Sequence, residues 1–181
     1  MKTILLTLLV MAFGLTSHAQ VKKVSLQASG LTCSMCSKAV LNALQEVSFV
    51  EKVQVDIKNQ QYSISFKTDS EADFDALTKA VEDAGFSVAS FTVTADVNNL
   101  KVQKDQHVQI GNHYFHFLNA ASQELNGTTT FTIVDKQYTS SKNHKKYSAM
   151  SKKECVQTGR SAGCCSSDNL AENTRIYHVI I

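Results

Sequence analysis

Between residues 21 and 47 the spacing of apolar residues changes once, from every second residue to every third or fourth. The change marks the border between two secondary-structure elements. Residues 21–28 alternate between apolar and polar side chains, which predicts a half-buried strand. From Met35 onward the apolar residues return with the period of a helix, and Val40 and Leu44 fall on its buried side. The pattern therefore predicts a strand and then a helix, joined by a short turn at residues 30–33.

Two further alternating runs follow, at residues 53–57 and 62–66. The dipeptide Asn59-Gln60 separates them and is suited to a turn. Two short alternating runs joined by a tight turn are typical of a β-hairpin. We therefore expect this segment to form two neighbouring antiparallel strands.

A second amphipathic helix is predicted after the hairpin. Ser70 is a suitable N-cap with Asp73 three residues later, and Gly85 stands where a helix commonly ends. The buried stripe of this helix consists of Phe74, Leu77, Val81 and Ala84. A last strand is predicted at residues 86–93. The order β-α-β-β-α-β predicts an α+β, ferredoxin-like domain over residues 20–93.

The pattern changes in the remaining part, residues 94–181, which we interpret as a second domain. Residues 94–106 are polar and predict a linker or a weak first strand. Strands are predicted at residues 108–110, 114–118, 131–134 and 176–181. The dipeptides Gly111-Asn112 and Asn126-Gly127 indicate turns between them, and residues 140–154 are compatible with a helix. This is a small β-rich domain with one helix, and an OB-type barrel fits its number of strands.

Residues 1–19 have the composition of a secretory signal peptide. Lys2 provides a positive start, residues 4–15 are almost entirely apolar, and small residues occupy positions 17 and 19. The apolar run is shorter than the roughly 20 residues that a membrane-spanning helix needs. We therefore expect an exported protein, periplasmic or extracellular, cleaved before Gln20 and with no membrane insertion of the mature chain.

The charge of the mature chain gives no reason to expect a polyanionic partner. After removal of Lys2 with the signal peptide, 17 basic residues balance 16 acidic ones. Nucleic-acid binding depends mainly on a basic surface that neutralises phosphates. The sequence therefore predicts no nucleic-acid partner.

The stretch GLTCSMCSKAV, residues 30–40, carries the strongest chemical signal. Cys33 lies in the loop after the first strand, and Cys36 lies in the first turn of the first helix. The two-residue gap lets both sulfurs reach one ion, and the helix N-terminus favours thiolates over thiols. Two thiolates suit a soft ion of low coordination number such as Cu(I). We therefore expect Cys33 and Cys36 to be metal ligands.

Two other uses of the cysteine pair compete with metal binding. A thioredoxin-like redox couple would need the cis-proline of that fold, and the chain has no proline. A structural disulfide is compatible with export, but a bridge across two residues closes almost no chain and so stabilises little. Metal binding is the favoured interpretation, and a disulfide-handling protein that uses Cys33 and Cys36 remains an alternative.

The same stretch resembles the metal motif of the heavy-metal-associated domain family, G-M-T-C-x-x-C. Gly30, Thr32, Cys33 and Cys36 match the motif, and Leu31 replaces its methionine, which in the family is a buried anchor of the loop and not a ligand. The resemblance extends from residue 21 to about residue 93. It implies the fold and function of copper chaperones, of the metal-binding domains of P-type ATPases and of the periplasmic mercury-binding protein.

The resemblance also bears on the ion and on the surroundings of the loop. Phe86 matches an aromatic residue that packs near the metal loop in ATPase domains. Zinc-handling members tend to carry an acidic residue beside the first cysteine, and here Thr32 is neutral. Cu(I) is therefore the expected ion, with Hg(II) as the alternative and Zn(II) less favoured. The expected partners are a metal-transporting membrane protein or another metal-binding domain.

Three further cysteines, Cys155, Cys164 and Cys165, lie near the end of the chain. A disulfide from Cys155 to Cys164 or Cys165 would fit an oxidising compartment, and a second soft-metal site is the alternative. The mature histidines are interpreted as surface or hydrogen-bonded residues, namely His107, His113, His116, His144 and His178. His113 and His116 must point to opposite faces of a regular strand and cannot chelate together.

No Ser-His-Asp or paired-carboxylate arrangement stands out, so we expect a protein that is not an enzyme. The predicted function is that of an exported Cu(I) chaperone or scavenger, which transfers the ion by exchange between thiolates. A periplasmic Hg(II)-binding protein is the alternative. A further alternative is a binding module whose residues 95–181 dock onto a membrane efflux partner.

Overall fold

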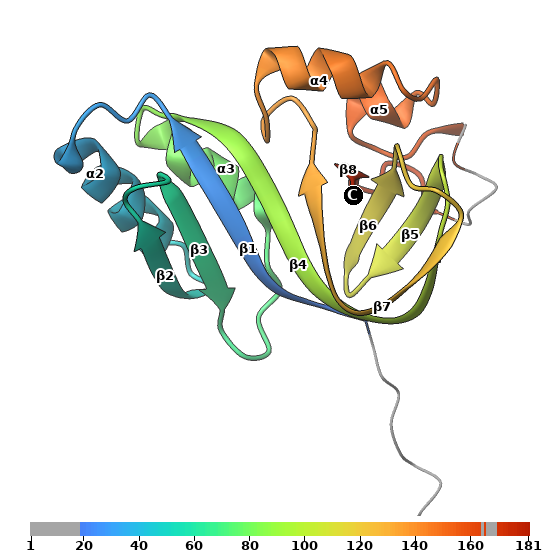
Figure 1. Cartoon of the computed structure of the whole chain (residues 1–181), viewed down its shortest axis with the longest axis horizontal. Coiled ribbons are helices and arrows are strands. Elements are labelled where there is room, and N and C mark those ends of the chain that lie inside the picture. The colour runs from blue at the N-terminus through green and yellow to red at the C-terminus, as the bar shows by residue number, and fades with distance from the viewer. Residues whose placement is uncertain (1–18, 164, 166–169) are drawn as a thin grey trace, which may run out of the picture.

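The computed structural model describes residues 19–163, 165 and 170–181, so the predicted signal peptide falls almost wholly outside it. The elements of the first half are β1 (Gln20–Ser29), α2 (Ser34–Gln45), β2 (Val50–Asp56), β3 (Gln61–Phe66), α3 (Phe74–Asp83) and β4 (Ser87–Val102). Their order confirms the predicted βαββαβ plan. Both helices lie on one face of the sheet and contact each other (Figure 1).

The two helices bury the residues that the helical period predicts. Val40 and Leu44 of α2 and Leu77 and Val81 of α3 are all completely buried. The N-cap of α3 differs from the prediction. The carboxylate of Asp73 accepts the backbone N–H of Ala76 at 3.1 Å. Ser70 instead donates its hydroxyl to a backbone carbonyl in the preceding turn, so the helix begins one turn later than predicted.

The elements of the second half are β5 (Gln106–Ile110), β6 (His113–Phe117), β7 (Gln123–Ile133), α4 (Ser141–Ser148), α5 (Cys155–Thr158) and β8 (Ile176–Ile180). All described strands join one eight-stranded sheet in the order β2-β3-β1-β4-β7-β8-β6-β5. Strand β8 lies between β7 and β6 and runs parallel to β6. The OB-type barrel therefore has no sheet of its own among the described residues, because these strands extend the sheet of the first half.

Strand β4 connects the two halves (Figure 1). It has 16 residues, pairs with β1 along its first part and with β7 from Phe91 to Val102. The segment predicted as a linker or a weak strand is thus mostly strand, and the predicted domain border between residues 93 and 94 falls inside β4. The register of the β4–β7 pair shifts between Val97 and Leu100, where Asn99 has a left-handed backbone with φ of 50°.

Two other expectations for the second half were wrong. Asn126-Gly127 does not form a turn but lies within β7, at the same irregularity, where the Asn126 side chain accepts the backbone N–H of Asn99. Of the helix predicted over residues 140–154, only α4 is formed; residues 149–154 are not helical, and α5 begins at Cys155, outside the predicted range. Helix α4 buries none of its residues, whereas the chain after it turns inward and buries Cys155 completely.

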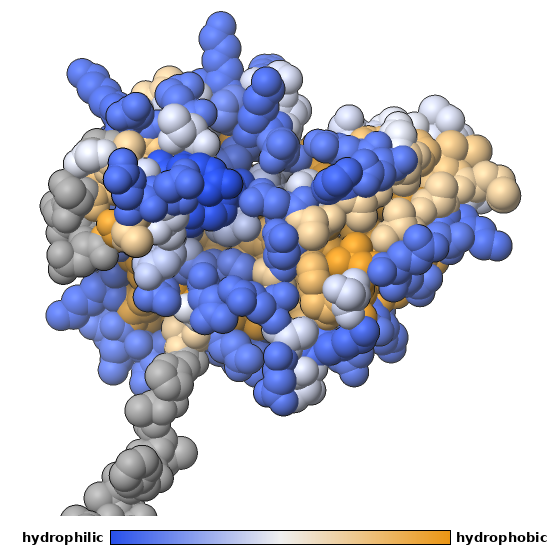
Figure 2. Space-filling model, turned by 180° about the vertical axis from the view of Figure 1, so that it is seen from behind, coloured by the Kyte–Doolittle hydropathy of each residue, from blue (hydrophilic) through white to orange (hydrophobic). Residues whose placement is uncertain are grey.

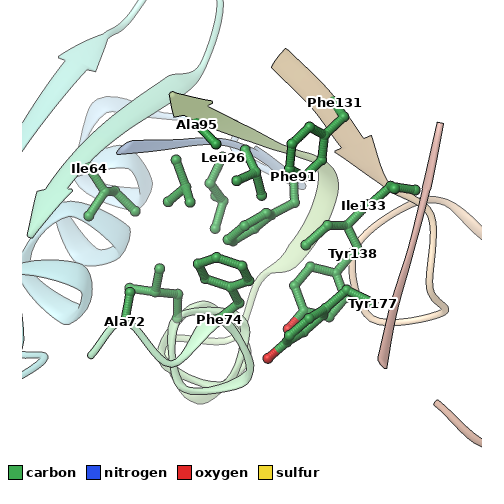
Figure 3. Close-up of a cluster of buried hydrophobic side chains, with 14 of the residues drawn as sticks. Leu26, Ile64, Ala72, Phe74, Phe91, Ala95, Phe131, Ile133, Tyr138 and Tyr177 are labelled. Carbon is green, nitrogen blue, oxygen red and sulfur yellow. The ribbon is translucent and has the colours of Figure 1, made fainter. Parts of the chain in front are cut away.

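The halves share one hydrophobic core, as Figure 3 shows. Phe74 of α3 packs against Phe91 of β4 and Tyr177 of β8, with ring centroids 5.6 and 5.2 Å apart. Tyr138, in the segment after β7, meets the Phe91 ring edge-on at 5.0 Å. Because these rings come from both halves of the chain, neither half can bury its apolar surface without the other.

An ion pair reinforces this junction. Arg175, just before β8, binds both carboxylate oxygens of Asp75 on α3 at 2.9 Å, and Tyr138 donates its hydroxyl to Asp75 at 2.6 Å. Burial raises the pKa of Asp75, but the hydrogen bonds from Arg175 and Tyr138 and the guanidinium charge outweigh it and hold the pKa below its usual range.

In the described part of the chain, no helix is both long and apolar enough to cross a bilayer.

Candidate metal centre

The loop between β1 and α2 packs on apolar residues of the core and accepts a hydrogen bond from Gln60. Gly30 has φ of 85°, which a glycine adopts without strain, and it turns the chain away from β1. A Cβ on Gly30 would lie 3.9 Å from the ring of Phe86, so the aromatic residue supports the loop from beneath. Leu31 packs against the core, and its carbonyl accepts a hydrogen bond from Gln60. These contacts place Gly30, Leu31 and Phe86 at the loop, and their supporting roles in metal binding stay predictions.

The loop delivers both cysteines to the N-terminus of α2. Cys33 is the N-cap, and its sulfur accepts the backbone N–H of Cys36 at 3.4 Å. The two sulfurs are 2.9 Å apart. This separation is longer than the roughly 2.05 Å of a disulfide and within the roughly 4.6 Å that two metal–sulfur bonds of about 2.3 Å can span. The described structure thus holds two neighbouring thiols within reach of one ion.

The local hydrogen bonds favour ionisation of the second cysteine. The side-chain hydrogen bond with Cys33 is the largest cause that lowers the pKa of the Cys36 thiol, and hydrogen bonds from Thr32 add to it against a small effect of burial. The Thr32 hydroxyl is 3.9 Å from the Cys36 sulfur. A thiolate is the form that binds soft metals, so the loop prepares Cys36 as a ligand.

The pair lies at the surface and not in a closed cavity. Cys33 is exposed, Cys36 is partly exposed, and the intervening Met35 exposes 71% of its surface. Seen from behind, the half that carries α2 and α3 has a hydrophobic band between polar margins (Figure 2). An exposed two-sulfur site can be approached by the thiolates of another molecule, which is the geometry that ligand exchange requires.

Comparison with known proteins agrees with this geometry. A model of the heavy-metal-associated domain matches residues 25–87. The periplasmic component of a mercuric transport protein from Acinetobacter calcoaceticus is 35% identical over 86 residues, which are 48% of this chain and 93% of that protein. The chain belongs to the heavy-metal-associated domain family. It is therefore a metal-binding protein, and its family match ends before β5 to β8.

Other members of the heavy-metal-associated domain family show the range of similar proteins. A copper-transporting ATPase from Helicobacter pylori is 34% identical over 65 residues, which are 36% of this chain but only 9% of the ATPase. The crystal structure of oxidized MerP from Ralstonia metallidurans CH34 has 37% identity, covers 38% of this chain and 96% of that chain, and gives a TM-score of 0.34. The relatives thus include proteins named for mercury and for copper.

Two of the tail cysteines lie in a hydrophobic cluster to which the metal loop does not belong. Cys155 and Cys165 are both buried in a small second cluster with Leu118 and Val134, whereas Cys164 lies outside the described residues. The disulfide that we predicted from Cys155 to Cys164 or Cys165 stays a prediction. The neighbours of the two described sulfurs include histidine rings, for which no metal role was predicted.

The histidines divide between the two faces of the sheet. His113 stacks on Phe74 in the main core, with centroids 4.3 Å apart, while His116 faces the tail cysteines, as their odd spacing predicts. Burial, followed by the nearby His178 and His107, lowers the pKa of His116 to about 3, so its ring is neutral at physiological pH. Buried, hydrogen-bonded histidines fall within the prediction, but their grouping with the tail cysteines was not expected, and it forms a second arrangement of possible ligands.

Proposed function

We propose that this protein carries a soft metal ion, Cu(I) in the first instance, on the thiolates of Cys33 and Cys36. The observation that supports this most is the pair of sulfurs 2.9 Å apart at the exposed N-terminus of α2. A Cu(I) bis-thiolate carries one negative charge, and the helix N-terminus favours negative charge at that position. A thiolate of the receiving protein can displace one of the two cysteine sulfurs from the ion. The ion therefore leaves by ligand exchange and not by dissociation into solution.

Hg(II) is the second candidate ion. It is supported by the match to the mercuric transport component over 93% of the length of that protein. Hg(II) with two thiolates is neutral, so it would gain less from the helix N-terminus than Cu(I). Competition distinguishes the two ions: reduced protein is titrated with Cu(I) against a copper chelator and with Hg(II) against a small thiol. Selective retention of Hg(II), with Cu(I) lost to the chelator, would replace Cu(I) by Hg(II) in the proposal.

We propose carriage and not catalysis. A redox protein would cycle a Cys33–Cys36 disulfide and would reduce insulin with many turnovers per chain. We expect no insulin reduction above that of a Cys33→Ser/Cys36→Ser variant. Clear turnover at substoichiometric protein would contradict carriage as the sole function.

The proposal also covers the cellular location of the protein and the partner with which it exchanges its ion. We propose that the chain is exported and exchanges its ion with a metal-transporting membrane protein or with another metal-binding domain. Cell fractionation tests the first part: the mature protein is expected to begin at Gln20 in the periplasm or the medium. A partner that docks onto residues 95–181 must be sought with the full chain, because a fragment beginning at residue 95 would cut β4.

A further inference from the structure

A row of histidines crosses three neighbouring strands of the second half. His107 of β5 faces His116 of β6 in register, and His116 in turn is the register partner of His178 of β8. All three side chains are buried, with exposures of 8%, 0% and 1% respectively. A row of buried polar rings in one sheet needs polar partners, because an unpaired polar group costs free energy in an apolar environment.

The sulfurs of two cysteines, from α5 and the segment after it, lie close to this row of histidines. The sulfur of Cys155, at the start of α5, is 3.5 Å from Nε2 of His107 and 3.6 Å from Nδ1 of His116. The sulfur of Cys165 is 3.7 Å from the same His107 nitrogen. The ligand atoms of His107, His116 and Cys155 all lie within 4.8 Å of one another. Nε2 of His107 is thus directed between two sulfurs.

The sulfur–nitrogen distances of Cys155 match those between ligands of one tetrahedral ion, and Cys165 lies at such a distance from His107 alone. With metal–sulfur bonds of about 2.3 Å and metal–nitrogen bonds of about 2.05 Å, a tetrahedral angle places sulfur and nitrogen about 3.5 Å apart. The three measured sulfur–nitrogen distances are within about 0.2 Å of this value. Hydrogen bonds from the thiols to the rings have similar lengths, and the experiments described below separate the two arrangements.

Carboxylates behind two of the histidines also fit a metal site. Asp105 accepts the Nε2–H of His116 at 3.2 Å, which leaves Nδ1 as the atom that faces Cys155. A ligating histidine in proteins commonly donates its other ring nitrogen to a carboxylate in this way. Asp105 also has φ of 61°, an unusual backbone for a residue other than glycine. The local backbone thus holds a carboxylate behind a ring that meets a sulfur on its other side.

His178 carries a similar carboxylate and an open ring nitrogen. Asp135 accepts the Nδ1–H of His178 at 2.7 Å. Nε2 of His178 is buried and has no hydrogen-bond partner within the described part of the chain. The His178 and His116 ring centroids are 5.1 Å apart. His178 is therefore an oriented imidazole beside the cluster, available as a replacement ligand.

We propose that His107, His116, Cys155 and Cys165 bind one divalent ion of the zinc type in a closed tetrahedral site. Charge favours this ion over Cu(I). Two thiolates and two neutral imidazoles make a Zn(II) site neutral, whereas Cu(I) would leave one negative charge buried, which is costly. The same argument favours Cys165 as the fourth ligand, because Cys155 alone would leave a positive charge.

The site would fasten the β5–β6 hairpin to the segment that carries α5. Four protein ligands leave no open position, which is the arrangement of structural and not catalytic zinc sites. The buried site therefore differs in kind from the exposed pair Cys33 and Cys36. It stabilises the second half while the first half exchanges its ion, and it does not depend on the proposed Cu(I) function.

Cobalt substitution of the full chain tests the proposal. The Cys33→Ser/Cys36→Ser variant is used as the parent, so that only the tail site can bind. Reduced parent protein is expected to bind one Co(II) per chain, with visible bands of a tetrahedral ion and sulfur-to-metal charge-transfer bands in the near ultraviolet. Zn(II) is expected to displace the Co(II). An additional His144→Gln change, on a histidine outside the cluster, is expected to leave these spectra unchanged.

Single ligand changes and a thiol assay complete the test. Cys165→Ser is expected to reduce the charge-transfer intensity by about half, because one of two thiolates is lost, and His116→Gln is expected to abolish the tetrahedral spectrum. In the parent chain, Zn(II) should protect Cys155 and Cys165 from alkylation. Co(II) spectra without thiolate bands, alkylation unaffected by zinc, or a Cys155–Cys165 disulfide in protein isolated with zinc would each overturn the proposal. The alkylation assay needs no variant at the tail site, so it remains decisive if the substituted chains fail to fold.

Discussion

Cys33 is the cap of the helix that carries Cys36: its sulfur accepts the Cys36 backbone N–H at 3.4 Å and lies 2.9 Å from the Cys36 sulfur. One side chain thus ends the loop, begins the helix and is a proposed ligand. The proposal therefore links metal capture and helix start through a single residue. Substitutions at Cys33 should separate the two roles.

Cys33→Ser should keep the helix cap but lose the metal, whereas Cys33→Ala should lose both. Serine is a preferred N-cap, so the apo Cys33→Ser protein should unfold at or above the temperature of the apo wild type. Alanine removes the acceptor and should lower the free energy of unfolding by about 0.5 kcal/mol, since sulfur is a weaker acceptor than oxygen. Thermal unfolding with a chelator present measures the order. Equal stabilities of the two variants would show that the Cys33 sulfur does not act as a cap.

Gly30→Ala should weaken metal binding without unfolding the protein. An alanine at φ of 85° is strained by about 1 kcal/mol, and its Cβ would contact the Phe86 ring. We expect a several-fold loss of Cu(I) affinity in a chelator competition, because the loop must shift. Gly127→Ala, with φ of 74° in β7, is the matched control. It should carry a similar strain and leave Cu(I) affinity unchanged; equal losses in both variants would remove the role of Gly30.

The Asp75–Arg175 ion pair should make the free energy of unfolding decrease at acidic pH. The pKa of Asp75 is lowered in the folded state, so its contribution is present above the unfolded pKa of about 3.9 and is lost as the pH falls through the folded value. The Asp75 side chain is 41% exposed, so Asp75→Asn should cost about 1–2 kcal/mol at neutral pH, less than a fully buried pair. Urea unfolding at pH 7 and pH 3 measures both values. A cost that is the same at the two pH values would contradict this assignment.

A fragment that ends at residue 93 should be less stable than the full chain. It would expose the β4 edge that pairs with β7 and uncover Phe91 and Val93, both completely buried in the full chain. Exposed sheet edges with apolar neighbours are prone to association. Size-exclusion chromatography and thermal unfolding of residues 20–93 and 20–181 compare the two. A monomeric fragment as stable as the full chain would show that the shared core contributes nothing to the first half.

The first half could be predicted from sequence because its signals are local. The spacing of apolar residues indicates β1, α2, β3 and α3 directly, and the C-x-x-C spacing predicts Cys33 and Cys36 as the metal pair without any knowledge of tertiary contacts. The continuation of β4 was predicted only as a linker or a separate weak strand, for a physical reason. Asn99 interrupts the alternation, so Leu100 and Val102 fall out of phase with Val97 and Ala95, and the strand reads as a polar linker.

The histidine–cysteine cluster could not be read from local pattern. Its residues come from β5, β6, α5 and a segment near residue 165, and only the fold brings them together. One signal was present in the sequence. His107 lies four residues before Gly111, and His116 lies four residues after Asn112, so the two are equidistant from the turn. Antiparallel strands around that turn place them opposite each other on one face.

The most direct test of metal carriage is the Cu(I) stoichiometry of intact, reduced protein by non-denaturing mass spectrometry. Three chains are compared: the wild type, Cys33→Ser/Cys36→Ser, and Cys155→Ser/Cys165→Ser, each in the presence of a competing copper chelator. We predict one tightly held Cu(I) in the wild type and in the tail variant, and none in the Cys33→Ser/Cys36→Ser chain. Retention of Cu(I) by that chain, with loss from the tail variant, would contradict the assignment of the carried ion to Cys33 and Cys36.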